Sequence, residues 1–197
     1  IEAKIPTGFK DYKTFELLDT LDKALTYVPN QKIEVQVGTK TTETTTTNKT
    51  IEKFVFEKKL AETDFTAEFK GPDQDKELKD TGGRLTVKLT DSGIKNLAKL
   101  LDNEGNVTQP GDEGKVIRVE FKTTINDNAV MSKNIPNTVT LKYGHNPDST
   151  GTTKPGENPR VYTGGKKFVK IDSSKNKEKL DGAKFVVKNS EGKYLAE

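Results

Sequence analysis

The sequence predicts an all-β protein, an antiparallel β-sandwich with one short helix. Most segments alternate apolar and polar residues with a period of two, and turn-forming Gly, Pro, Asn and Asp residues separate them. A single segment changes to a helical period. Hydrophobic residues make up only 30% of the chain, which fits a thin core spread over many short strands.

The first half of the chain holds most of the expected strands. They lie at 1–5, 13–21, 24–28, 32–38, 51–60 and 64–69. In the fourth of these, Ile33, Val35 and Val37 share one face, which is the pattern of a half-buried strand. Residues 39–50, "TKTTETTTTNKT", favour β structure but lack an apolar face. We therefore predict an exposed edge strand or hairpin over 39–50.

One helix is predicted after a further strand at 84–90. Its apolar residues recur at helical spacing and are Ile94, Leu97, Ala98 and Leu101. Thr90 or Asp91 can cap the start of this helix, and Gly105 lies beyond its end.

Two more strands are expected at 115–125 and 137–143. The first is the longest alternating run of the chain, with Ile117, Val119 and Phe121 on its apolar face. Residues 144–160 are dense in Gly, Pro, Asn and Asp, and we interpret them as a linker or a long surface loop.

We place a domain boundary near residue 160. Strand patterns resume at 166–172 and 183–189, but residues 161–197 are too few to bury a core alone. The expected organisation is a sandwich domain over 1–160, lacking its first strand, and the incomplete opening of a second sandwich over 161–197.

Composition excludes several classes of function. The formal charge is only +3 and charges of both signs are interspersed, which argues against nucleic acid as a partner. No apolar run approaches the roughly 18 residues that span a bilayer, so we expect no membrane insertion. With one His and no Cys, most hydrolase and zinc sites are excluded, and we expect neither an enzyme nor a cofactor or metal.

Lys170 is the first candidate for chemistry. It shares one face of an alternating strand with Phe168, and burial of its ammonium would favour the neutral, nucleophilic amine. The alternative is that Val169 and Ile171 form the core face and Lys170 is solvated. Alternation alone favours this second interpretation.

The surroundings of Lys170 resemble a known module. "FVKID" at 168–172, "LDGAKFVV" at 180–187 and "EGKY" at 191–194 are similar to the opening of a Cna B-type domain. This Ig-like sandwich builds backbone pilins and adhesins of Gram-positive bacteria. In the family, the matching lysine forms an intramolecular isopeptide bond with an Asn or Asp on the last strand, assisted by a buried Glu. The resemblance implies this role for Lys170, with Lys167 as a less favourable register and the partners beyond Glu197.

The first domain resembles the Cna A-type module of such pilins. "YKTFELLDTLDKALTY" at 12–27 and "IPNTVTLKY" at 135–143 are similar to the segments that carry its catalytic Asp and its acceptor Asn. The resemblance implies that Asp19 is the isopeptide-assisting acid and Asn137 the acyl acceptor. Their lysine is expected on a strand upstream of Ile1, because Lys4 matches poorly.

Each of these residues also has a plainer interpretation. Asp19 can end a strand through an Asx-type turn, and Asn137 follows a proline and can belong to a turn. Glu120 is an alternative acid, although a solvated face shared with Arg118 suits it better.

The resemblance implies a structural subunit of a sortase-assembled pilus shaft, located outside the cell and anchored to the cell wall. Its partners would be other pilin subunits, joined covalently. Autocatalytic Lys–Asn bonds would then supply the crosslinks that a chain without cysteine cannot make as disulfides. The alternative function is a host-matrix-binding adhesin built on the same domains.

Overall fold

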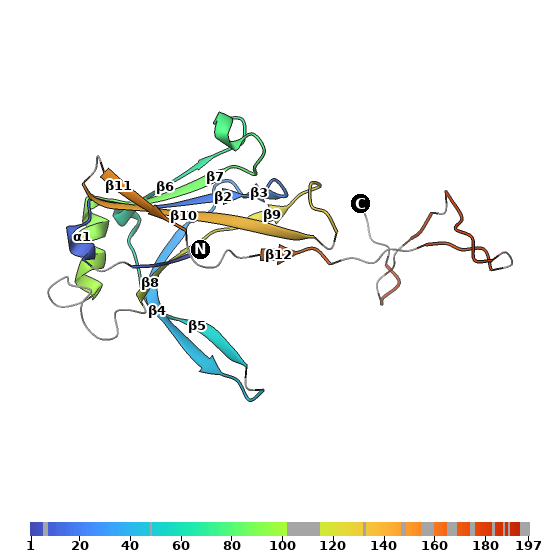
Figure 1. Cartoon of the computed structure of the whole chain (residues 1–197), viewed down its shortest axis with the longest axis horizontal. Helices are drawn as coiled ribbons and strands as arrows, with labels where there is room; N and C mark the ends of the chain where they lie inside the picture. Colours follow the sequence, from blue (N-terminus) through green and yellow to red (C-terminus); the bar gives the residue numbers. More distant parts are fainter. Residues whose placement is uncertain are drawn as a thin grey trace. The chain divides into compact units, whose positions relative to one another are not determined.

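The structure is a computed structural model, drawn in Figure 1. It describes residues 1–5, 8–47, 49–101, 115–131, 133–146, 149–154, 160–164, 169–173, 176–182, 184–186, 188 and 190–193. The chain forms two compact units, residues 1–163 and residues 164–197, beside the predicted boundary near residue 160.

Antiparallel sheets form the first unit. One sheet has the order β1-β8-β4-β5, with bounds Glu2–Lys4, Lys115–Glu120, Glu34–Thr44 and Thr50–Lys59. The other has the order β11-β10-β2-β7-β6, with bounds Ser149–Thr153, Asn134–Asn146, Thr14–Leu21, Arg84–Leu89 and Phe65–Lys70. Strand β12 (Arg160–Tyr162) pairs with β10, and β3 (Leu25–Tyr27) pairs with β9 (Thr123–Ile125). The predicted all-β sandwich with one short helix is confirmed.

The core lies between the two sheets because each strand turns alternate residues inward. Its buried side chains include Phe15, Leu17, Val35, Val37, Leu85, Val87, Ile117, Val119, Val139 and Leu141. Short 3-10 helices at Phe9–Asp11, Glu62–Asp64 and Lys76–Leu78 connect the strands.

Helix α1 (Asp91–Leu101) buries all four residues that the helical spacing selects. Its N-terminus is capped by Thr90, whose Oγ1 accepts a hydrogen bond of 3.1 Å from the backbone N–H of Gly93. Asp64 fixes the same end of the helix, since its carboxylate accepts a hydrogen bond of 2.9 Å from Asn96. Gly105, predicted to follow the helix, lies outside the described residues.

The single strand predicted over 115–125 is wrong, because β8 ends at Glu120 and β9 begins at Thr123. The side chain of Gln31 lies at the break. It donates a hydrogen bond of 2.8 Å to the carbonyl of Lys122 and accepts one from the N–H of Lys122. The side chain of Gln31 thus bonds the backbone of Lys122 in place of a neighbouring strand. After the break, β9 pairs with β3, whereas β8 pairs with β1 and β4.

The linker predicted over 144–160 is also wrong in part. Strand β10 continues to Asn146, and β11 follows as its hairpin partner, with Gly151 opposite Tyr143. The nearest atom of the Tyr143 ring lies 3.8 Å from a Cβ built on Gly151. A glycine beneath an aromatic ring is therefore compatible with a strand here, although a high density of glycine normally indicates a loop.

The Thr-rich segment lies in a projecting hairpin. The pairing of β4 with β8 ends at Thr39. Beyond it, strands β4 and β5 project from the body of the first unit, and residues 41–44 and 50–53 are exposed (Figure 1). In the second unit, Ile171 and Lys179 form an isolated antiparallel bridge, flanked by a hydrogen bond of 2.9 Å from the N–H of Leu180 to the carbonyl of Lys170.

Candidate functional site

Strand β2 places a carboxylate in the interior. Its alternation directs Phe15, Leu17 and Leu21 into the core, and Asp19 takes an inward position in the same series. Leu85 of β7 lies opposite Asp19 on one side, and Val139 of β10 lies opposite it on the other. The exposed fraction of Asp19 is 0%, so an ionisable group is enclosed by apolar neighbours.

Strand β10 brings an amide to this carboxylate. The register pairs Val139 with Asp19 and Asn137 with Leu21, so Asn137 is the diagonal neighbour of Asp19 on the same face. The Asn137 Nδ2 donates a hydrogen bond of 2.8 Å to the Asp19 Oδ2. Two sequence segments separated by 118 positions thus meet through a pair of polar side chains on the inner face.

The remaining oxygens of the pair have no donor among the described residues. These buried atoms are the Oδ1 of Asp19 and the Oδ1 of Asn137. A buried acceptor without a donor costs about 1–3 kcal/mol. An amine or ammonium group that reached the pair would supply the missing donors.

Burial raises the pKa of Asp19 to about 6, although the Asn137 hydrogen bond and the nearby Ile1 ammonium oppose the rise. The Ile1 amino group donates a hydrogen bond of 2.8 Å to the carbonyl of Val119, on the opposite sheet. Burial lowers the pKa of this amine, and the Asp19 carboxylate acts against that shift. The backbone just before β1 therefore lies near Asp19.

This arrangement can activate an amide. With a pKa of about 6, roughly a tenth of the Asp19 side chains carry a proton at pH 7. A protonated Asp19 can donate to the Asn137 Oδ1 once the carboxamide turns over and exchanges its oxygen and nitrogen. The carbonyl is then polarised toward an attacking amine.

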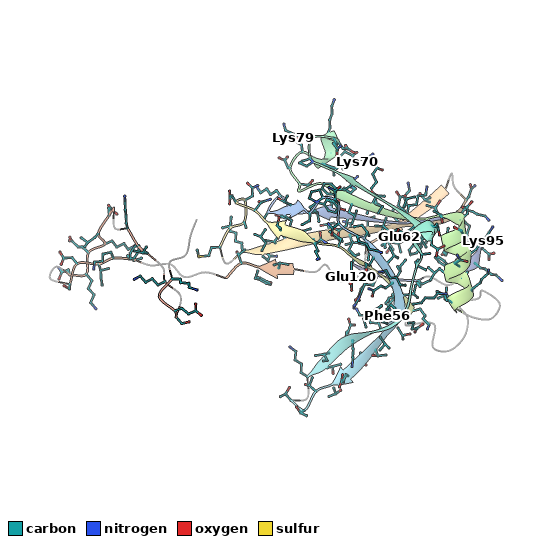
Figure 2. All side chains as sticks on the ribbon, turned by 180° about the vertical axis from the view of Figure 1, so that it is seen from behind. Phe56, Glu62, Lys70, Lys79, Lys95 and Glu120 are labelled. Carbon is teal, nitrogen blue, oxygen red and sulfur yellow. The ribbon has the colours of Figure 1, made fainter. Side chains whose placement is uncertain are left out.

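The structure brings Asp19 and Asn137 together but not the other candidates. Glu120 has a half-exposed side chain, and its Oε1 lies 3.7 Å from Nη1 of Arg118 (Figure 2).

None of the candidate lysines that the structure describes is buried. Lys4 is exposed on β1. Lys170 is exposed in the second unit, as are Val169 and Ile171, and Lys167 lies outside the described residues. The isopeptide role of each residue stays a prediction.

The sequence contains a signal for Asp19 that needs no family resemblance. In "TFELLDTL" the inward positions are occupied by Phe15, Leu17, Asp19 and Leu21, and one ionisable residue interrupts an apolar series. What alternation missed is the approach of Ile1, which is bonded to Val119 of the opposite sheet and lies near Asp19.

No group of three or more His, Asp or Glu side chains within the described residues could hold a metal ion. In that same part of the chain no helix is long and apolar enough to cross a bilayer.

Comparison with solved structures finds major pilins. The major pilin GBS80 of Streptococcus agalactiae, in its 35 kDa C-terminal fragment, superposes with a TM-score of 0.56 and 27% identity over 97% of this chain and 56% of that one. BcpA, the major pilin subunit of Bacillus cereus, gives 0.52 and 18% identity over 95% of this chain and 40% of that one. The chain thus spans 56% of the GBS80 fragment and 40% of the BcpA chain.

No protein-family model and no curated protein matches the chain. BcpA shows the fold alone, and GBS80 confirms the predicted resemblance to Gram-positive major pilins.

Proposed function

We propose that this chain is part of a structural subunit of a Gram-positive pilus shaft, and that an isopeptide bond at Asn137 locks its first sandwich. The buried Asp19–Asn137 pair, with two acceptors that lack donors among the described residues, carries the proposal. Likeness to a major pilin over nearly the whole chain supports the structural role.

The bond would form in one acyl transfer. The neutral amine of a lysine attacks the carboxamide carbon of Asn137, while protonated Asp19 donates to the carboxamide oxygen. As the tetrahedral intermediate collapses, its C–N bond to Nδ2 breaks, and Nδ2 leaves as ammonia with a proton from the attacking amine. Asp19 recovers its own proton, and no cofactor or second enzyme takes part.

Burial supplies the conditions for this reaction. A lysine that is desolvated beside the pair loses its charge more readily, because burial disfavours the ammonium form. Fixed positions in a packed core replace a bimolecular encounter and give a large effective concentration. We expect the lysine on a strand that precedes Ile1 in the longer protein.

The product suits a fibre under tension. An amide crosslink between the first and last strands of a domain closes a loop of more than a hundred residues, and by analogy with disulfides it adds about 4–5 kcal/mol. Reductants do not cleave it, and it needs no cysteine, of which the chain has none.

The remaining expectations belong to the same proposal. Lys170 would form the corresponding bond of the second domain, and sortase would join this subunit to other pilins in an extracellular, wall-anchored polymer. The protein would act on no other substrate and would therefore not be an enzyme in the usual sense. Binding to host matrix stays the alternative predicted from the sequence.

Intact mass spectrometry of the longer protein tests the bond. The first domain should be lighter than its calculated mass by one ammonia, about 17 Da, and peptide mapping should find a lysine joined to Asn137. Asn137→Ala should remove the deficit of the first domain, whereas Asn134→Ala, an exposed Asn on the same strand, should keep it. A first domain of full mass in the wild type would overturn the proposed crosslink.

A further inference from the structure

Strand β5 is an open edge. It ends the order β1-β8-β4-β5 and pairs only with β4 among the described strands, so its outer N–H and C=O groups have no strand beside them. Nine of its ten residues are exposed, and the apolar ones include Val55 at 43% and Phe56 at 57%. Natural edge strands are usually short or covered, because an open one templates pairing with another chain.

The sequence of β5 is complementary to itself. In "EKFVFEK", residues 52–58, antiparallel pairing about Val55 places Phe54 opposite Phe56 of a second copy. The same register sets Lys53 opposite Glu57 and Glu52 opposite Lys58. Opposed residues differ by an even number of positions, so each pair lies on one face of the sheet, and two-fold symmetry makes every pair occur twice.

One aromatic residue of β5, Phe54, is held in place by its own chain. Phe54 packs over Gly38 of β4, where any Cβ would overlap its ring, and the Arg118 guanidinium lies 3.7 Å from the centre of that ring. Phe56 is opposite Gly38 in the register and remains the most exposed aromatic of the strand (Figure 2). Phe54, already fixed by these contacts, loses little side-chain entropy when a partner covers it, and Phe56 supplies exposed apolar area for the partner to cover.

Two acidic residues of β5 contact its inner neighbours. Glu52 pairs with Lys40, and Glu57 accepts a hydrogen bond of 2.6 Å from Lys115. Both partners lie on the β4 and β8 side of the strand. The hairpin of β4 and β5 projects from the body of the first unit (Figure 1).

We propose that β5 pairs antiparallel with β5 of a second copy of this chain, about a two-fold axis at Val55. Two four-stranded sheets would become one continuous sheet of eight strands. Such an isologous contact closes on itself and does not propagate, so it differs from a head-to-tail junction within one fibre. It is a lateral contact and does not depend on the isopeptide bond.

The contact is small, since a stable interface commonly buries about 800 Å² on each partner and one strand pair provides less. We therefore expect a dissociation constant of the order of 10–500 µM. Sedimentation equilibrium of this chain, from about 10 µM to 1 mM, should show a reversible monomer–dimer equilibrium. Hydrogen exchange should show the amides of β5 gaining protection as the concentration rises.

Charge reversal tests the register. In a dimer of Lys58→Glu, the Glu52 of each copy lies opposite the new carboxylate of the other copy. In a dimer of Glu52→Lys, each new ammonium group lies opposite Lys58 of the other copy. Each variant should therefore weaken the dimer at least about tenfold. An equimolar mixture of the two variants should form heterodimers, and the double variant should dimerise like the wild type. Lys95→Glu on α1 changes the net charge by the same amount as Lys58→Glu and is the control.

Three results would overturn the proposal. They are a monomer throughout the concentration range, a dimer that Lys95→Glu weakens as much as Lys58→Glu does, and single variants that fail to associate when mixed. The outcome is independent of the mass measurement at Asn137.

Discussion

Asn137 of β10 donates a hydrogen bond of 2.8 Å to Asp19 of β2 inside the sandwich, across 118 positions of sequence. The β2–β10 register alone creates this contact. A slip of one residue on either strand would turn one member of the pair to the opposite face of the sheet and separate them. The site is therefore as well defined as the strand pairing itself, which makes its consequences measurable in this chain.

Asp19 should make the stability of this chain depend on pH. Burial raises its pKa from 3.8 to about 6, so between about pH 4 and 6 the folded state holds a proton that the unfolded state has lost. The free energy of unfolding should fall as pH rises through this window, by up to about 3 kcal/mol at pH 7. Asp19→Asn should be more stable than wild type at pH 7 and similar near pH 4, in urea titrations. Asp80→Asn, at an exposed position, is the control.

Loss of the amide should act through the carboxylate. Asn137→Ala removes the hydrogen bond that lowers the pKa of Asp19, so this pKa should rise above about 6. The variant should lose more stability at pH 7 than at pH 4, because only the ionised carboxylate is left without a donor. A carbon-13 NMR titration of the Asp19 carboxyl measures the change, and an unchanged midpoint would contradict it. Asn134→Ala is the matched exposed control.

Gly93 should not tolerate the smallest side chain. Replacing a helical Gly with Ala normally stabilises by about 0.5–1 kcal/mol, but here the added Cβ would overlap the carbonyl oxygen of Asp64. We expect Gly93→Ala to destabilise the chain by about 2–4 kcal/mol, since backbone must move and α1 must leave its site. Chemical denaturation measures this, with Lys95→Ala on the exposed face as the neutral control. A stabilised Gly93→Ala would disprove the close contact.

Gln31 should hold the break between β8 and β9. Its side chain bonds the carbonyls of Val28 and Lys122 and the N–H of Lys122. Gln31→Ala should cost about 1–2 kcal/mol and expose the Lys122 amide to hydrogen exchange. Gln31→Glu should cost more, because it faces two carbonyl oxygens with an acceptor. Equal protection of Lys122 in wild type and Gln31→Ala would show that other contacts keep the break.

Some features could be found from sequence because they are local. The helical spacing of Ile94, Leu97, Ala98 and Leu101 selects the face that α1 buries. The missing apolar face of the Thr-rich segment predicts the exposed hairpin. Other features could not be found because their causes are distant. Gln31 interrupts a strand 91 positions away, and residues 149–153 become β11 by pairing with β10.

The sequence alone determined that this protein is a thin β-sandwich with one amphipathic helix and without disulfides. Alternation carries this information because it sets the face of each residue. Only the tertiary structure decided which strands are neighbours, and therefore that Asp19 meets Asn137 and that β5 is left as an open edge. Alternation does not encode pairing or register, which arise when distant segments compete to bury their apolar faces together.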